Sequence, residues 1–202
     1  MHISEGVLSG PVLAGGWTLA AAGTALGLKR LDYDRLMTVA ILSAAFFVAS
    51  LIHVPIGPVS AHLILNGLLG AILGLAAFPA ICVALLLQAV LFQYGGLVVL
   101  GVNAFDMAFP AVLCSLVFGP WLRSTGTRRS VAAFCCGFFA VLLAALFTAA
   151  ALALSGEAFL TTAWAIFLAH LPIMAVEGVI TAMAVGFLAK VRPELLSIRL
   201  AG

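Results

Sequence analysis

The chain has 202 residues, of which 65% are hydrophobic and 8% are charged, and its formal net charge at pH 7 is +2. Its mean hydropathy of +1.29 lies far above that of soluble globular domains. The composition therefore excludes a soluble domain. It predicts an integral membrane protein surrounded by the lipid bilayer, with no nucleic acid as a partner.

Apolar segments follow one another along the whole chain. A helix needs roughly 20 apolar residues to cross a hydrocarbon core about 30 Å thick. Only short polar connectors separate the segments, without a long linker or an internal repeat, so we expect a single domain over residues 1–202. The predicted fold class is an all-α transmembrane bundle of about seven helices, at 10–28, 36–52, 62–78, 80–101, 107–122, 130–154 and 162–189.

The basic residues predict how this bundle is oriented. With the N-terminus outside, all nine lysines and arginines fall in the connectors 29–35 and 123–129 or in the tail after residue 189. In membrane proteins the cytoplasmic connectors carry the excess of Lys and Arg. We therefore expect the N-terminus outside and the C-terminus in the cytoplasm.

The opening "MHISEGVLSG" contains no Lys or Arg, whereas a secretory signal peptide begins with a positively charged region. An N-terminal Met-His pair is a chelator, because the amine of Met1, the deprotonated backbone nitrogen of His2 and the His2 imidazole close two fused rings around one metal ion. His62 opens the third predicted helix at the same outer side and can supply a fourth nitrogen. The positive end of that helix would keep His62 neutral. Four nitrogen donors suit Ni(II), Cu(II) or Co(II) rather than Mg(II) or Ca(II).

A second interpretation of these histidines stays open on pattern alone. A histidine near an N-terminus is usually solvated, and a loop histidine usually bonds to backbone. His53 lies in the same outer connector as His62, and it is a candidate fifth ligand, a residue that orients a ligand, or a loop histidine bonded to backbone.

The last predicted helix carries two further polar residues. His170 and Glu177 are seven residues apart and so share one helix face. A carboxyl group near the middle of a membrane is costly unless it is protonated or paired. We expect both residues in a buried polar network that supports structure or gating, rather than as ligands. The four cysteines have no metal-binding spacing and are expected as free, buried thiols.

Four motifs in chain order resemble the CbiM/NikM family, the substrate-binding membrane subunits of energy-coupling-factor (ECF) transporters for cobalt and nickel. The motifs are "MHISEG" at 1–6, "HVPIGPVSAHLILNGLLGAILG" at 53–74, "LLLQAVLFQYGGLVVLGVNAFDMAFPA" at 85–111 and "HLPIMAVEGVITAMAVGFLAKVRPELL" at 170–196. The resemblance implies a metal held by Met1, His2 and His62. Where many relatives read "FQHGG" and "NTFNMA", this chain has Tyr94 and Asp106, which weakens any supporting role carried over to them.

The resemblance also implies partners in a prokaryotic cytoplasmic (inner) membrane. These are a coupling membrane subunit (CbiQ/NikQ-like), a cytoplasmic ATPase (CbiO/NikO-like) and a separate small accessory subunit (CbiN/NikN-like). The substrate is cobalt(II) or nickel(II), with cobalt preferred, for cobalamin biosynthesis or nickel enzymes. ATP enters only through partner subunits, because the chain has no G-x-x-x-x-G-K-[ST] phosphate loop of its own.

Two other function classes are weighed against this transport subunit. An intramembrane metalloenzyme could use His170 and Glu177, but no H-E-x-x-H pair is present. A passive metal channel or scaffold could share the same bundle and charge bias. We expect a transport subunit and not an enzyme.

Overall fold

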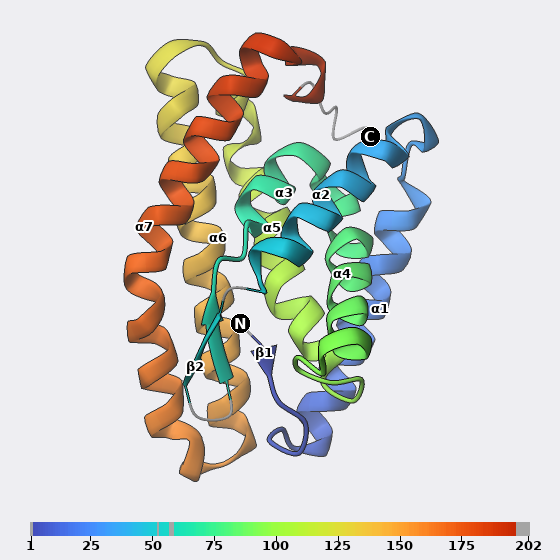
Figure 1. Ribbon diagram of the computed structural model, residues 1–202, viewed down its shortest axis with the longest axis vertical. Helices are drawn as coiled ribbons and strands as arrows, with labels where there is room; N and C mark the ends of the chain where they lie inside the picture. The colour runs from blue at the N-terminus through green and yellow to red at the C-terminus, as the bar shows by residue number, and fades with distance from the viewer. Residues whose placement is uncertain (1, 52, 57–58, 197–202) are drawn as a thin grey trace.

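The structure is a computed structural model that describes residues 2–51, 53–56 and 59–196, and it is mostly helical (Figure 1). The helices of the described residues are α1 (Gly10–Lys29), α2 (Leu36–Ala49), α3 (Asn66–Leu73), α4 (Ala77–Phe92), α5 (Leu100–Leu122), α6 (Gly126–Ser155) and α7 (Leu160–Val191). The strands are β1 (His2–Ile3), β2 (His53–Ile56) and β3 (Val59–His62). Short 3-10 turns are η1 (Tyr33–Arg35), η2 (Gly74–Ala76), η3 (Glu157–Phe159) and η4 (Pro193–Leu196).

The predicted count of seven membrane-spanning helices is not confirmed. Within the described part of the chain, five helical segments are long and apolar enough to cross a membrane: Gly10–Lys29, Asn66–Phe92, Leu100–Leu122, Gly126–Ser155 and Glu157–Val191. Helix α2 has 14 residues, which at 1.5 Å per residue is about 21 Å and too short for a core of about 30 Å.

The all-α prediction is wrong for the chain around residues 53–62. Three strands of the described residues form an antiparallel sheet in the order β1-β3-β2, with His2 opposite Ser60 and His53 opposite His62. Pro55 has no N–H to donate, and it lies in β2, which is an edge strand where a missing donor is tolerated.

The predicted helix 62–78 is divided for a backbone reason. His62 ends β3, and Leu65 then adopts a left-handed conformation with φ of 55° before α3 begins at Asn66. Gly74 has φ of 56° and ends α3 after eight residues. An apolar run therefore becomes a strand, a turn and a short buried helix.

The predicted helices 80–101 and 107–122 have different bounds in the structure. Helix α4 ends at Phe92 and α5 begins at Leu100. Between them Gly95 and Gly96 have φ of 73° and 136°, values that glycine adopts without a Cβ clash. This glycine loop lies at the end of the bundle to which β1 leads (Figure 1).

Helix α3 forms the centre of the molecule, and all eight of its residues are buried. Its backbone lies against its neighbours: a Cβ added at Gly67 would lie 2.5 Å from the Cα of Gly137 in α6, and one at Gly70 would overlap the Ala111 carbonyl of α5. Helices α4, α5, α6 and α7 all contact it, and α7 lies on the outside of the bundle (Figure 1).

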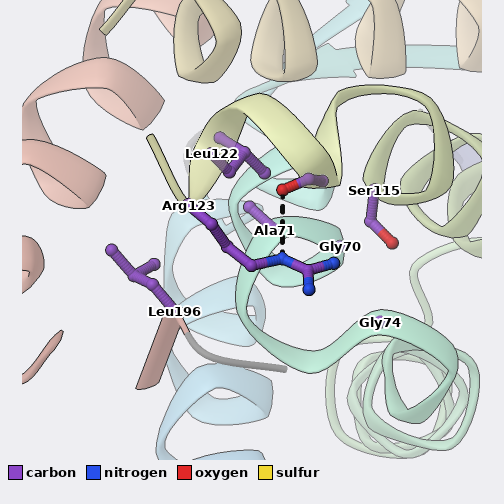
Figure 2. A pocket seen from close by; sticks show the side chains of 8 residues that line it. Gly70, Ala71, Gly74, Ser115, Leu122, Arg123 and Leu196 are labelled. Atoms are coloured by element: carbon purple, nitrogen blue, oxygen red, sulfur yellow. Dashed lines mark hydrogen bonds between the residues drawn. The ribbon is translucent and has the colours of Figure 1, made fainter. Parts of the chain in front are cut away.

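The basic connectors gather at one end of the bundle. The α1–α2 connector, the α5–α6 connector and the end of α7 lie together at the top of Figure 1. There Arg35 donates from Nη2 to the carbonyls of Ile72 (3.1 Å) and Leu195 (3.4 Å). A cavity of about 20 Å³ lies at this end, lined in part by Gly70, Gly74 and Ser115, with room for about one water. Figure 2 shows Arg123 beside it, donating from Nε to the Gly119 carbonyl at 3.3 Å.

Candidate functional site

The N-terminal segment is docked inside the bundle. Ile3 is fully buried and pairs with Val59 in the β1–β3 ladder. On its other side the Ile3 N–H donates to Oδ1 of Asn103 (3.0 Å), and Nδ2 of Asn103 donates to the Ile3 carbonyl (3.2 Å). Strand β3 and an amide side chain of α5 therefore hold the backbone next to His2 from two sides.

The glycine loop closes over the same segment. Oε1 of Glu5 accepts a hydrogen bond from the Val98 N–H at 3.0 Å. A Cβ on Gly95 would lie 2.8 Å from Nδ2 of Asn103, so the loop approaches this side chain as closely as only glycine allows.

His2 and His62 lie together, as the topology predicted. Their ring centroids are 4.5 Å apart with 33° between the ring planes. Both side chains are buried. Nε2 of His2 lies 2.7 Å from Oε1 of Gln88, and Nδ1 of His62 lies 2.7 Å from the Leu63 carbonyl. A carbonyl only accepts, so Nδ1 of His62 carries the proton and Nε2 is the lone-pair nitrogen.

Burial keeps both imidazoles neutral. It lowers the pKa of His2 to about 3 and lowers the pKa of His62 well below its ordinary value. Neutral imidazole is the form that binds metal. The predicted cause, the positive end of a helix, is wrong for His62, because this residue ends β3 and α3 begins only at Asn66.

His53 lies at the border of this pair. It stands opposite His62 in the β2–β3 register and is half-buried. Its Nδ1 lies 3.0 Å from the Leu51 carbonyl, and its ring packs edge-on against Tyr94 at 4.5 Å. The Tyr94 ring is in turn 6.1 Å from that of His2.

Glu177 and His170 are fully buried on α7. Oε1 of Glu177 accepts hydrogen bonds from the N–H groups of Ile64 and Leu65 (2.8 Å for the latter), two and three residues after His62. His170 donates from Nδ1 to the Ile166 carbonyl one turn earlier in the helix, at 2.7 Å. Glu177 thus holds the turn behind His62.

Two other predicted positions have separate outcomes. Met1 lies outside the described residues. Asp106 is buried on α5, where Oδ2 accepts a hydrogen bond from Thr148 of α6 at 3.2 Å.

Within residues 2–51, 53–56 and 59–196, no group of three His, Cys, Asp or Glu side chains is arranged to hold a metal ion. A metal at His2 and His62 would therefore need main-chain nitrogen donors as well.

Sequence reasoning overlooked two amides. Gln88 bonds to His2, and Asn103 bonds to the backbone of Ile3. The sequence indicates both positions, because each is a single amide side chain within an apolar run, "LLLQAVLF" for Gln88 and "LGVNAF" for Asn103. Polar groups within membrane segments are rare and mark functional sites.

Known proteins are similar to this chain in sequence and in fold. A protein of Haemophilus influenzae, named for metal transport, is 42% identical over 98% of this chain and 97% of its own length. The cobalt transport protein CbiM of Kyrpidia tusciae is 33% identical over 98% of this chain and 86% of its own. The fused nickel transport protein NikMN of Rhodobacter capsulatus is 34% identical over 98% of this chain and 65% of its own.

The crystal structure of a truncated transition metal transporter superposes with a TM-score of 0.81, at 31% identity, over 94% of this chain and 99% of that one. A family model described as cobalt uptake substrate-specific transmembrane region matches residues 2–195. A match over nearly the whole chain, together with several apolar helices, identifies a multi-pass membrane protein. The chain belongs to the CbiM family.

Proposed function

We propose that this chain is the substrate-specific membrane subunit of an ECF-type ABC transporter, which captures a divalent transition metal ion outside the cell. The observation that carries the proposal is the pair of buried, neutral imidazoles of His2 and His62, 4.5 Å apart at the docked N-terminus. A pair of neutral nitrogen donors next to a chain terminus offers a metal ion ligands without a carboxylate.

The proposed ligands are the Met1 amine, the backbone nitrogen and imidazole of His2, and the imidazole of His62. The amine and the backbone nitrogen close a five-membered ring on the metal. The backbone nitrogen and Nδ1 of His2 close a six-membered ring. Four nitrogens favour Ni(II), Co(II) or Cu(II) over Mg(II) and Ca(II).

Supporting roles are proposed for three further residues. His53 orients Tyr94 and the edge of the sheet, and Glu177 fixes the turn after His62. His170 lies seven residues before Glu177 on α7 and completes the polar face that supports this turn.

The proposed orientation puts the N-terminus outside and the basic end of the bundle in the cytoplasm of a prokaryote, across the inner membrane. Energy then comes from an ATPase and a coupling membrane subunit, and a small accessory subunit completes the complex. The fused NikMN relative supports the accessory subunit, because this chain spans 65% of that protein's length. The loaded subunit would reorient and release the ion inward.

Cobalt is the proposed substrate and nickel the second choice. A deprotonated amide nitrogen favours Ni(II) over Co(II) on the general order of affinity. The family description, in contrast, names cobalt uptake, and the opening "MHI-x-EG" pattern resembles the cobalt members of the family. The imported metal would supply cobalamin biosynthesis or nickel enzymes.

The test is a titration of the purified protein with Co(II) and Ni(II), with its natural N-terminus and with one residue added before Met1. We expect one ion per chain for the natural form and loss of binding on extension, because extension converts the amine into an amide. Equal binding by both forms, or by neither, would contradict the chelate.

A second experiment separates the function classes. In vesicles a transport subunit should carry metal only with its ATPase and coupling subunit, whereas a channel would carry flux alone. An intramembrane metalloenzyme centred on His170 would remain active after His2→Ala. A metal-capture subunit would instead lose metal binding in the same variant.

A further inference from the structure

Gln88 has a complete set of hydrogen bonds although it lies fully buried in the apolar helix α4. Its Nε2 donates to the Phe47 carbonyl at 3.1 Å and to Oγ of Ser50. Its Oε1 faces Nε2 of His2 at 2.7 Å. The side chain thus bridges α2 to the N-terminal histidine.

The surroundings allow one orientation of this amide. The Phe47 carbonyl can only accept, so the NH₂ group of Gln88 must face it. The hydroxyl of Ser50 uses its own proton on the Phe46 (2.9 Å) or Phe47 (3.1 Å) carbonyl, and it therefore accepts from Gln88. The accepting oxygen of Gln88 is left for His2.

An accepting oxygen at this position selects the tautomer of His2. Nε2 must carry the proton that Oε1 of Gln88 accepts, so Nδ1 carries the lone pair. Nδ1 is the nitrogen that closes a six-membered ring with the residue's own backbone nitrogen. His62 has the opposite tautomer, because its Nδ1 donates to the Leu63 carbonyl.

We propose that Gln88 is the positioning residue of the metal site, which fixes the ring and tautomer of His2 so that Nδ1 faces the metal. This inference rests on the proposed function. Hydrogen bonds to the second nitrogen of a metal-binding histidine orient the ring and raise its basicity, and their loss typically lowers metal affinity by about 10–100-fold.

The experiment compares three variants of the full chain with its natural N-terminus, by titration with Co(II) and Ni(II). Gln88→Met keeps the length of the side chain and removes the accepting oxygen, and we expect affinity to fall about 10–100-fold. Gln88→Glu, protonated at this buried position, keeps an accepting oxygen for His2 and an O–H donor for the Phe47 carbonyl, and it should restore most of the affinity. Ser43→Ala is the matched control, since it removes another α2–α4 hydrogen bond, to the Ala80 carbonyl (2.7 Å), without touching His2.

A second readout measures the tautomer directly. The protein has four histidines, so ¹⁵N-histidine spectra of the metal-free protein can be assigned by single substitutions. We expect His2 protonated at Nε2 in the wild type and in Gln88→Glu, and a mixture of tautomers in Gln88→Met. This measurement keeps the inference falsifiable even where Gln88→Met fails to fold, because a wild-type His2 protonated at Nδ1 would overturn it.

The outcomes separate this inference from the proposed function. If the wild type binds metal and Gln88→Met binds equally well, or if His2 carries its proton on Nδ1, the role of Gln88 is overturned and the proposed function stands. If the wild type binds neither Co(II) nor Ni(II), the proposed function is contradicted, and the role of Gln88 in metal binding falls with it.

Discussion

At the scale of single residues, the site depends on burying groups that normally prefer water. His2 and His62 are held neutral by burial, and each ring has a hydrogen-bond partner on one nitrogen, Gln88 for His2 and Leu63 for His62. Burial without such partners would cost free energy. The partners therefore make it possible to keep two metal-binding rings in an apolar bundle.

The pKa of His2 predicts how the docked N-terminus responds to pH. It is about 3 in the folded protein because burial disfavours the charged ring, against about 6.5 for an exposed histidine. Between these values the undocked segment binds the proton more readily. The contribution of His2 to docking is therefore fully present above about pH 6.5, and it falls by up to about 1.4 kcal/mol for each pH unit below that value.

Hydrogen exchange of the Ile3 amide in the metal-free protein measures this effect between about pH 4 and 7, after correction for the intrinsic exchange rate. His2→Phe should reduce the pH dependence of this exchange. The pH dependence that is left should come from His62, whose pKa burial also lowers. An unchanged slope in His2→Phe would show that another group controls docking.

At the scale of elements, the predicted connector 53–61 contains strand β2 and most of β3, and the predicted helix 62–78 is divided among the end of β3, α3, η2 and the start of α4. Helix α2 ends near the middle of the bundle, and β2 and β3 continue beside α7 in its lower half (Figure 1). Non-helical backbone is tolerated at membrane depth where protein surrounds it. Strand β3 meets this condition, because it lies between β1 and β2 and contacts α7.

The contact between β1 and α5 should decide whether the N-terminal segment stays docked. Asn103→Leu would leave the N–H and the carbonyl of Ile3 unpaired in a buried place. We expect the local stability of the segment to fall by about 2–4 kcal/mol, with faster exchange of the Ile3 amide and weaker metal binding. Glu5→Gln is the control, since its side chain keeps an oxygen for the Val98 N–H. If the Ile3 amide exchanges as slowly in Asn103→Leu as in the wild type, the two hydrogen bonds from Asn103 do not hold the segment in place.

The contact between α7 and the turn after β3 carries a separate prediction. Glu177→Leu removes the acceptor of the Ile64 and Leu65 N–H groups, so we expect a loss of about 2–4 kcal/mol in stability and weaker metal binding through His62. Glu177→Gln retains one oxygen and should be milder. Thermal unfolding in detergent and metal titration are the measurements. A Glu177→Leu protein as stable as the wild type would show that water replaces this acceptor.

At the scale of the whole molecule, the fold separates two ends. The docked N-terminus and the two histidines lie in the half of the bundle reached by β1, β2 and β3, and the basic connectors lie at the opposite end (Figure 1). Helix α3 joins these regions: the turn held by Glu177 precedes it, and Arg35 donates a hydrogen bond to its Ile72 carbonyl. The packing of α3 therefore affects the entire bundle.

This central packing can be tested with one methyl group. Gly67→Ala would place its Cβ 2.5 Å from the Cα of Gly137, so α3 and α6 must move apart. We expect a destabilisation of about 1–3 kcal/mol, visible as a lower melting temperature in detergent. Gly15→Ala is the control because a Cβ there has nothing within 4 Å. Equal melting temperatures for Gly67→Ala and the wild type would show that α3 and α6 accommodate the added methyl group without loss of stability.

The sequence by itself determined the membrane class, the clustering of the basic residues and the proximity of His2 and His62. These follow from composition, charge position and the alternation of connectors, which act along the chain. Only the tertiary structure decided that residues 53–62 form strands and that Gln88, Asn103 and Glu177 bond to the N-terminal segment and the turn after His62. Residues 53–61 were expected as a polar connector, because the pairing of β3 with β1 joins segments that lie far apart in the chain. The partners of these polar side chains lie 86 to 113 residues away in the chain, where no local pattern predicts them.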